Sequence, residues 1–180
     1  MAKVILAAGV SVDGFFEGPD REIDWHRVDE ELHLHFNDWL SRVDGFIHGR
    51  ITYDLMAAYW PTADREPSAT PAEVEFAGIW RDKPKIVYSR TLGEAGWGST
   101  IRREVVPEQV KALEGTFTVG GAELADAFVG HGLIDEYRIY VHPVAIGDGR
   151  PLFRRAVDLE LLDTRTFGNG VVLLRYAPAK

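Results

Sequence analysis

The stretch that most constrains this fold is residues 115–128, where a strand pattern passes through two glycines into a helix pattern. Residues 116–119 are β-branched or aromatic throughout, which is typical of a buried strand. Apolar residues at helical spacing follow, and Gly130 provides a stop signal. Gly120 and Gly121 stand at the junction between the two patterns. The sequence therefore predicts a strand that turns sharply into a helix.

Two interpretations of this junction remain open. The first N–H groups of a helix have no partner within the helix, and glycine lets another group approach the bare backbone. These N–H groups and the positive end of the helix dipole favour a bound anion, most often a phosphate. In the alternative interpretation, the two glycines only shape a tight turn.

Composition limits the classes of partner. At 180 residues the chain is expected to form one domain, residues 1–180, and its 46% hydrophobic and 11% aromatic content supplies a substantial core. The absence of cysteine excludes disulfides, thiolate metal sites and a cysteine nucleophile. A net charge of −8 argues against nucleic acid or an anionic membrane as a partner, so any anion site must be local. No signal peptide or membrane span is evident, and a soluble cytoplasmic protein is expected.

Hydrophobic periodicity predicts alternating strands and helices followed by a run of strands. This order predicts an α/β fold with a mostly parallel sheet and an antiparallel C-terminal hairpin, whose turn is Gly168-Asn169-Gly170. Residues 15–19 and 59–69 are expected to be loops, and residues 134–141 a half-solvated strand. The predicted strands are 4–8, 46–49, 85–88, one short strand within 97–106, 116–119, 134–141, 159–167 and 171–176; the predicted helices are 25–43, 50–56, 70–80, 107–113 and 122–130.

Three strand-to-loop junctions carry residues suited to a phosphate-rich ligand. In an open α/β sheet, ligands bind outside the carboxyl ends of the strands, where all three junctions lie. The alternative is that Arg50 and Arg90 are ordinary surface residues, as a single arginine usually is, but the coincidence of three such junctions favours a ligand cleft. There is no dinucleotide-binding fingerprint after the first strand, no P-loop and no nucleophile elbow. The three junctions are Gly49-Arg50-Ile51-Thr52, Ser89-Arg90-Thr91 and Gly120-Gly121-Ala122.

Asp13 is the candidate catalytic carboxylate. It lies just past the first strand, and Phe15 and Phe16 beside it are candidates for the wall of a ring-shaped substrate site. The alternative is that Asp13-Gly14 is an ordinary turn. No metal site is expected, because the Glu-x-x-His spacing of Glu30 and His33 occurs only once.

Seven motifs follow one another along the chain from about residue 4 to residue 176, essentially its whole length. They are Ser-Val-Asp-Gly-Phe, Gly-Arg-Ile-Thr-Tyr, Tyr-Trp-Pro, Lys-Ile-Val-Tyr-Ser-Arg-Thr-Leu, Gly-Gly-Ala-Glu-Leu, Leu-Ile-Asp-Glu-Tyr-Arg-Ile-Tyr-Val-His-Pro-Val and Phe-Gly-Asn-Gly-Val-Val-Leu. In this order the motifs resemble the dihydrofolate reductase-like proteins, and more narrowly the reductase domain of the bifunctional riboflavin-biosynthesis deaminase/reductase.

This resemblance implies a central sheet of about eight strands flanked by helices, with NADPH across the carboxyl ends of the strands. Asp13 would lie on the substrate side. Dihydrofolate reductases carry an acid on the first helix, but no single acid aligns within residues 24–31. The resemblance implies that Gly49, Arg50 and Thr52 lie near the cofactor phosphates, Ser89 and Arg90 near the 2′-phosphate, Gly120, Gly121, Ala122, Glu123 and Leu124 at the pyrophosphate, and Ala7 and Ala8 against the nicotinamide.

The expected function is that of an NADPH-dependent reductase of a small heterocyclic or carbonyl substrate. A 5-amino-6-(5-phosphoribosylamino)uracil reductase-like or a dihydrofolate reductase-like activity would fit, with Asp13 or a water it orients assisting proton transfer. The alternatives are an NADP(H)-binding protein without turnover and an interaction module. A homodimer that pairs through the final strands is also expected.

Overall fold

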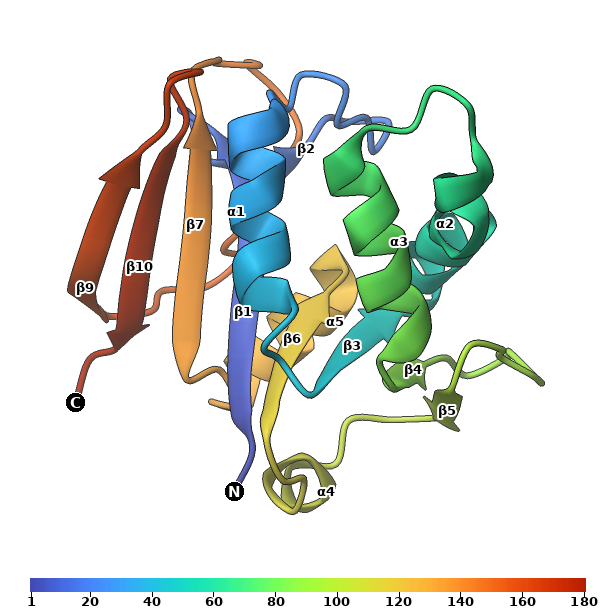
Figure 1. Cartoon of the computed structure of the whole chain (residues 1–180). Coiled ribbons are helices and arrows are strands. Elements are labelled where there is room, and N and C mark those ends of the chain that lie inside the picture. Colours follow the sequence, from blue (N-terminus) through green and yellow to red (C-terminus); the bar gives the residue numbers. More distant parts are fainter.

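Eight strands form one sheet in the order β5-β4-β3-β6-β1-β7-β10-β9 in the computed structural model, which describes residues 1–180 (Figure 1). The six strands from β5 to β7 are mutually parallel, whereas β10 runs antiparallel to both β7 and β9. Strands β2 and β8 pair separately. The predicted α/β fold with a mostly parallel sheet and an antiparallel C-terminal hairpin is confirmed.

The strands are β1 (Lys3–Ser11), β2 (Phe15–Glu17), β3 (Gly45–Gly49), β4 (Lys85–Tyr88), β5 (Ser99–Arg102), β6 (Thr116–Gly120), β7 (Glu136–His142), β8 (Arg150–Pro151), β9 (Leu159–Thr166) and β10 (Val172–Pro178). The helices are α1 (Glu30–Leu40), α2 (Arg50–Tyr59), the 3₁₀ helix η1 (Trp60–Arg65), α3 (Pro71–Asp82), α4 (Pro107–Lys111) and α5 (Ala122–Gly130).

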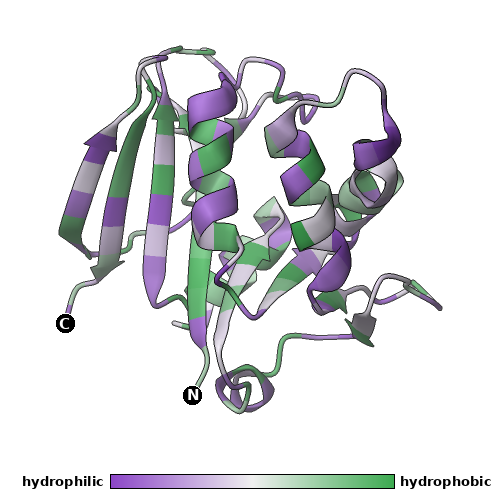
Figure 2. Cartoon of the chain, viewed as in Figure 1, coloured by the Kyte–Doolittle hydropathy of each residue, from purple (hydrophilic) through white to green (hydrophobic).

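Helices cover both faces of the sheet. Helices α1 and α3 lie in front of the sheet in Figure 1, and α5 lies behind it. Because side chains alternate along a strand, β1 contributes Val4 and Leu6 to the core behind the sheet and Ile5 to the core in front. Figure 2 shows β1 as an almost continuously apolar strand, as expected for a strand buried on both faces. This double burial explains why a run of apolar residues forms the central strand.

Helix α3 begins where its capping pattern predicts. The Thr70 side chain accepts a hydrogen bond from the Glu73 N–H at 3.2 Å, and the Glu73 carboxylate accepts one from the Thr70 N–H at 2.7 Å. Pro71 occupies the first helical position, where its missing N–H costs nothing. The capping box therefore forms in full and fixes the start of this helix.

Helix α1 begins later than predicted, because residues 25–29 pack across the carboxyl ends of β1 and β7. The Arg27 N–H donates to Nδ1 of His142 at 2.9 Å, which holds this segment in a non-helical path. Asp29 then caps the helix by accepting from the Leu32 N–H at 3.0 Å. A contact 115 residues away in the chain thus overrides the helical periodicity that precedes Asp29.

Three further expectations were wrong. Residues 60–65 form η1 rather than a loop, and Phe15 and Phe16 belong to β2, which pairs with β8. Strand β7 is buried along most of its length rather than half-solvated, because it lies between β1 and β10 with residues packed on both faces. Local alternation cannot reveal such a central position in the sheet.

None of the helices has both the length and the apolar character that crossing a membrane would require.

Candidate active-site cleft

Two helices begin side by side at the point where the sheet connections change face. Gly49 is the N-cap of α2 and Gly121 is the N-cap of α5. Helix α2 packs into the core in front of the sheet through Tyr53, whereas α5 packs into the core behind it through Phe128. Strands β3 and β6 are neighbours, so the two helices diverge from adjacent carboxyl ends. Such a switch point creates a crevice in which ligands of open α/β sheets bind.

Gly121 has a backbone conformation that a side chain would disrupt. Its φ of 106° lies in the region that favours glycine. A Cβ atom at this position would lie 3.1 Å from Oγ1 of Thr52 and 3.5 Å from the Gly49 nitrogen. The first hydrogen bond within α5 joins the Ala125 N–H to the Gly121 carbonyl, so the preceding helical N–H groups have no partner within the helix. The two N-termini therefore form a narrow cradle suited to an anion.

Two arginines, Arg50 and Arg90, lie beside this cradle on the side of β4. Arg50 donates to Asp54 at 2.7 Å and lies 3.5 Å from the Thr91 hydroxyl. Ser89 shapes the turn after β4, because its Oγ accepts from the N–H groups of Thr91 and Leu92. Arg90 is exposed and forms no ion pair. The contact between Arg50 and Thr91 therefore brings together two of the junctions predicted from the sequence, residues 49–52 and residues 89–91.

An apolar cleft of about 380 Å³ adjoins the cradle between the sheet and helices α1 and α3. Its floor comes from the carboxyl halves of β1, β3 and β6, and aromatic side chains form much of its wall. No aspartate, glutamate, lysine or arginine lines it. The lining residues are Ala7, Ala8, Gly9, Val28, His33, Phe36, Trp39, Leu40, Phe46, His48, Met56, Trp60, Phe76, Thr118, Val119, Gly120 and Tyr140.

The two histidines of the cleft are uncharged at neutral pH. Burial and, to a smaller extent, the nearby Lys85 ammonium together lower the pKa of His48 to about 4. Burial also lowers the pKa of His33, against the opposing effect of Glu73 and Glu75. The polar groups of the cleft therefore offer hydrogen bonds without charge.

Most of the sequence-predicted cofactor residues lie at the cradle or in the cleft. Ala7, Ala8 and Gly120 line the cleft. Ala122 opens α5, whereas the exposed Glu123 pairs with Arg154 at 2.9 Å. The side chain of Leu124 is buried in the core behind the sheet, which leaves only its backbone for a ligand.

Asp13, Phe15 and Phe16 lie outside this cleft. The Asp13 carboxylate accepts from the N–H groups of Gly147 at 2.8 Å and Ile146 at 3.2 Å. Hydrogen bonds from Ser11 and then from these N–H groups lower the pKa of Asp13, which keeps it ionised. Its contacts in this structure join the turn after β1 to the loop after β7.

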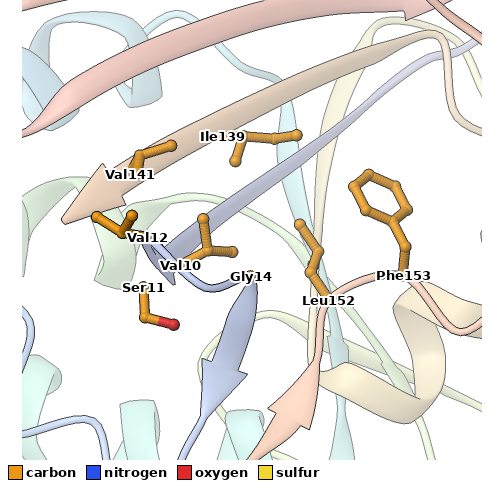
Figure 3. A pocket seen from close by; sticks show the side chains of 8 residues that line it. All are labelled: Val10, Ser11, Val12, Gly14, Ile139, Val141, Leu152 and Phe153. Carbon is orange, nitrogen blue, oxygen red and sulfur yellow. The ribbon is translucent and has the colours of Figure 1, made fainter. Parts of the chain in front are cut away.

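A second, smaller cavity of about 220 Å³ adjoins this turn, behind the sheet (Figure 3). Six of its eight lining residues are hydrophobic, and its polar side chain is that of Ser11, whose Oγ accepts from the Phe15 N–H at 3.0 Å. The cavity offers no charged group to a ligand. The lining residues are Val10, Ser11, Val12, Gly14, Ile139, Val141, Leu152 and Phe153.

Sequence reasoning did not identify His48 or Arg103 as site residues. His48 follows Phe46 by two positions on β3, so strand alternation was the signal that both face the cleft. Arg103 donates to the carbonyls of Ser89 and Leu92 at 2.9 and 2.6 Å. No local pattern predicts this contact, because it joins two loops.

Comparisons with known proteins agree with this architecture. The protein YyaP of Bacillus subtilis (strain 168), described as uncharacterized, is 34% identical over 182 residues, which cover 97% of this chain and 94% of YyaP. A putative riboflavin biosynthesis protein from Shewanella sp. PV-4 has a similar structure, with a TM-score of 0.73, 20% identity and 99% coverage of both chains.

A third similar protein is the diaminohydroxyphosphoribosylaminopyrimidine deaminase/5-amino-6-(5-phosphoribosylamino)uracil reductase of Thermotoga maritima. Its structure matches with a TM-score of 0.66 at 12% identity, over 99% of this chain and 57% of the other. The fold is therefore that of the dihydrofolate reductase-like proteins. The model of the RibD C-terminal domain matches residues 2–173, and the chain belongs to that family.

Proposed function

We propose that this protein is an NADPH-dependent reductase of a small heterocyclic or carbonyl substrate. The observation that carries the proposal is the cradle of two helix N-termini, at Gly49 and Gly121, beside an apolar cleft. A dinucleotide needs an anion site next to a site for a flat ring, and here the two adjoin. Membership of the RibD C-terminal domain family supports reductase chemistry.

The residues of the cradle fit the phosphates of such a cofactor. The free N–H groups at the start of α2 and α5 would hold the diphosphate, and Gly121 leaves room for close approach. Arg90 would contact the 2′-phosphate beside Ser89. Ala7 and Ala8 have small side chains and would let the nicotinamide ring lie flat on β1. NADPH, when bound, supplies the hydride.

The first test is the preference for NADPH over NADH. The two cofactors differ only in the 2′-phosphate, and a charge-assisted hydrogen bond contributes about 1.5–3 kcal/mol. We expect Arg90→Ala to weaken NADPH binding roughly ten- to a hundredfold and to leave NADH binding nearly unchanged. Tryptophan fluorescence titrations would measure both affinities, because Trp39 and Trp60 line the cleft.

Arg42→Ala is the matched control, because Arg42 is an exposed arginine that follows α1 and pairs with Asp38. It should bind both cofactors like the parent protein. An equal loss of NADH and NADPH affinity in Arg90→Ala would remove Arg90 from this role. Oxidation of NADPH in the presence of candidate substrates then separates a reductase from a protein that binds the cofactor without turnover.

We also propose that the protein is a homodimer formed through its C-terminal strands. Strands β9 and β10 extend beyond the helices at one edge of the sheet (Figure 1), and Leu161 on β9 is 54% exposed. Pairing this edge in a symmetric dimer would remove the exposed Leu161 and Leu162 side chains from water. Light scattering at micromolar concentration should give twice the 20.1 kDa mass of the chain, and Leu161→Lys should shift the mass toward the monomer. A mass of 20.1 kDa for the parent protein would refute the proposal.

A further inference from the structure

Glu123 is an acidic residue in the first turn of α5, beside the N–H groups proposed for the diphosphate. A carboxylate in the first turn of a helix is attracted to the positive end of the helix dipole and to the N–H groups that have no helical partner. In that position Glu123 would compete with the diphosphate for the same donors and would repel its charge. The cradle therefore needs this carboxylate to be held elsewhere.

Two other helices show where an acid at this end of a helix goes in this chain. At α3, the Glu73 carboxylate folds back and accepts from the Thr70 N–H at 2.7 Å. At α1, the Asp29 carboxylate accepts from the Leu32 N–H at 3.0 Å. By contrast, no side chain caps α2 or α5, the two helices of the cradle. Helix α2 has no acid in its first turn, so only Glu123 of α5 needs an explanation.

Arg154 supplies that explanation, because it binds both oxygens of the Glu123 carboxylate, at 2.9 and 3.2 Å. Arg150 lies 3.7 Å from one of the same oxygens. Isolated surface ion pairs are weak, but a bidentate arginine–carboxylate pair within a network of charges is the favourable exception. The hydrogen bonds from Arg154 lower the pKa of Glu123 against a smaller opposing effect of burial, so the carboxylate is charged at neutral pH. The ion pair is therefore intact under ordinary conditions.

The same segment makes a second bidentate pair with α5, farther along the helix. Arg155 donates to the Asp126 carboxylate at 2.9 and 3.2 Å. Asp126 lies beyond the first turn, where the N–H groups already have helical partners. One helix thus carries two similar arginine–carboxylate pairs, and only the pair of Glu123 lies at the cradle.

We propose that Arg154 is a positioning residue for the cofactor, which keeps the N-terminus of α5 free for the diphosphate by binding Glu123. This inference rests on the proposed function and deepens it, because it names a residue that sets the affinity of the anion site without contacting the cofactor. Loss of Arg154 releases a carboxylate into the cradle. The role depends wholly on the charge of Glu123, which distinguishes it from that of a direct phosphate ligand.

Fluorescence titration with NADPH tests this dependence. Arg154→Ala should weaken NADPH binding roughly three- to tenfold. Adding Glu123→Gln to this variant should recover most of the loss, because the amide has no charge to repel the diphosphate. If Arg154 contacted the phosphate directly, the double variant would stay as weak as the single one. Arg155→Ala is the matched control, which removes an equal charge from the same segment and should bind NADPH like the parent protein.

A second measurement needs no cofactor. Inorganic pyrophosphate, followed by NMR through the amide signals of residues 121–124, should bind the parent protein and lose affinity in Arg154→Ala. The same amide signals should respond more strongly to the titration of Glu123 in this variant than in the parent protein, because the released carboxylate then lies beside them.

Three results would overturn the inference: parent-like NADPH affinity in Arg154→Ala, a double variant as weak as the single one, or an equal loss in Arg155→Ala. A parent protein that binds neither NADPH nor pyrophosphate would overturn both this inference and the proposed function. The two also fail separately. Pyrophosphate binding with the expected effect of Arg154→Ala, but without NADPH binding, rejects only the reductase. NADPH binding that Arg154→Ala leaves unchanged rejects only the role of Arg154.

Discussion

Replacing Gly121 by valine is expected to abolish NADPH binding. The new Cβ atom would lie 3.1 Å from Oγ1 of Thr52 and 3.5 Å from the Gly49 nitrogen, inside the cradle proposed for the diphosphate. The φ of 106° is also unfavourable for any side chain, and backbone strain of this kind costs about 1–3 kcal/mol. Fluorescence titration with NADPH and a thermal melt would measure the two effects separately.

Gly132→Val is the matched control for backbone strain. Gly132 also has a positive φ, of 62°, but a Cβ atom there would contact nothing within 4 Å. This variant should lose a similar amount of stability and keep its NADPH affinity. Gly121→Ala adds only the Cβ atom and serves if the valine variant does not fold. Parent-like NADPH affinity in a folded Gly121 variant would show that the diphosphate assignment is wrong.

The second large effect is expected at Glu136, the first residue of β7. Its carboxylate is 2% exposed and lies 2.6 Å from Lys3 on β1, 2.7 Å from Arg138 on β7 and 3.0 Å from Arg175 on β10. One buried anion thus links three strands through ion pairs with three cations. Its removal breaks three ion pairs at once and leaves Arg138, whose side chain is 14% exposed, without its partner. Loss of one partner of a buried ion pair costs about 3–5 kcal/mol.

We therefore expect Glu136→Gln to lower the free energy of unfolding by about 3–5 kcal/mol. Urea denaturation at pH 7 would measure the change. Asp38→Asn is the control, because Asp38 pairs with Arg42 where both side chains are about two-thirds exposed, and such pairs contribute about 0–1 kcal/mol. Similar losses in the two variants would contradict the role assigned to Glu136.

The shifted pKa of the Glu136 carboxylate makes the stability of the protein depend on pH. Burial would raise the pKa of Glu136, but hydrogen bonds from Lys3, Arg175 and Arg138 outweigh it and lower the pKa to about 2. A depressed pKa in the folded state stabilises the protein above the unfolded value of 4.5, and this stability is lost as pH falls toward 2. Protonation of Glu136 should lower the free energy of unfolding of the parent by about 3 kcal/mol. Glu136→Gln has no carboxylate at this position and should lack this contribution. Denaturation curves between pH 6 and pH 2 would compare the two proteins, and parallel curves would contradict the assignment.

Much of the architecture was predictable, because its signals are local. The capping box at Thr70 needs only residues within one helical turn, and the hairpin turn at residues 168–170 needs only its own backbone preferences. The strand, two glycines and helix at residues 116–130 likewise form where the pattern predicts them. The positions of Gly49 and Gly121 at carboxyl ends of parallel strands followed from the order of elements.

The sequence by itself determined the order of the five α-helices and of the eight strands of the main sheet, the parallel sheet with its antiparallel end and the glycine junctions, because each depends on neighbouring residues or on periodicity. Only the tertiary structure decided that residues 25–29 leave the helix to contact His142, that Arg103 supports the turn at Ser89 and that His48 is buried without a partner. Each of these depends on segments far apart in the chain, and the free energy of such contacts is absent from any local pattern. The character of the cleft, apolar and without charge, was decided in the same way.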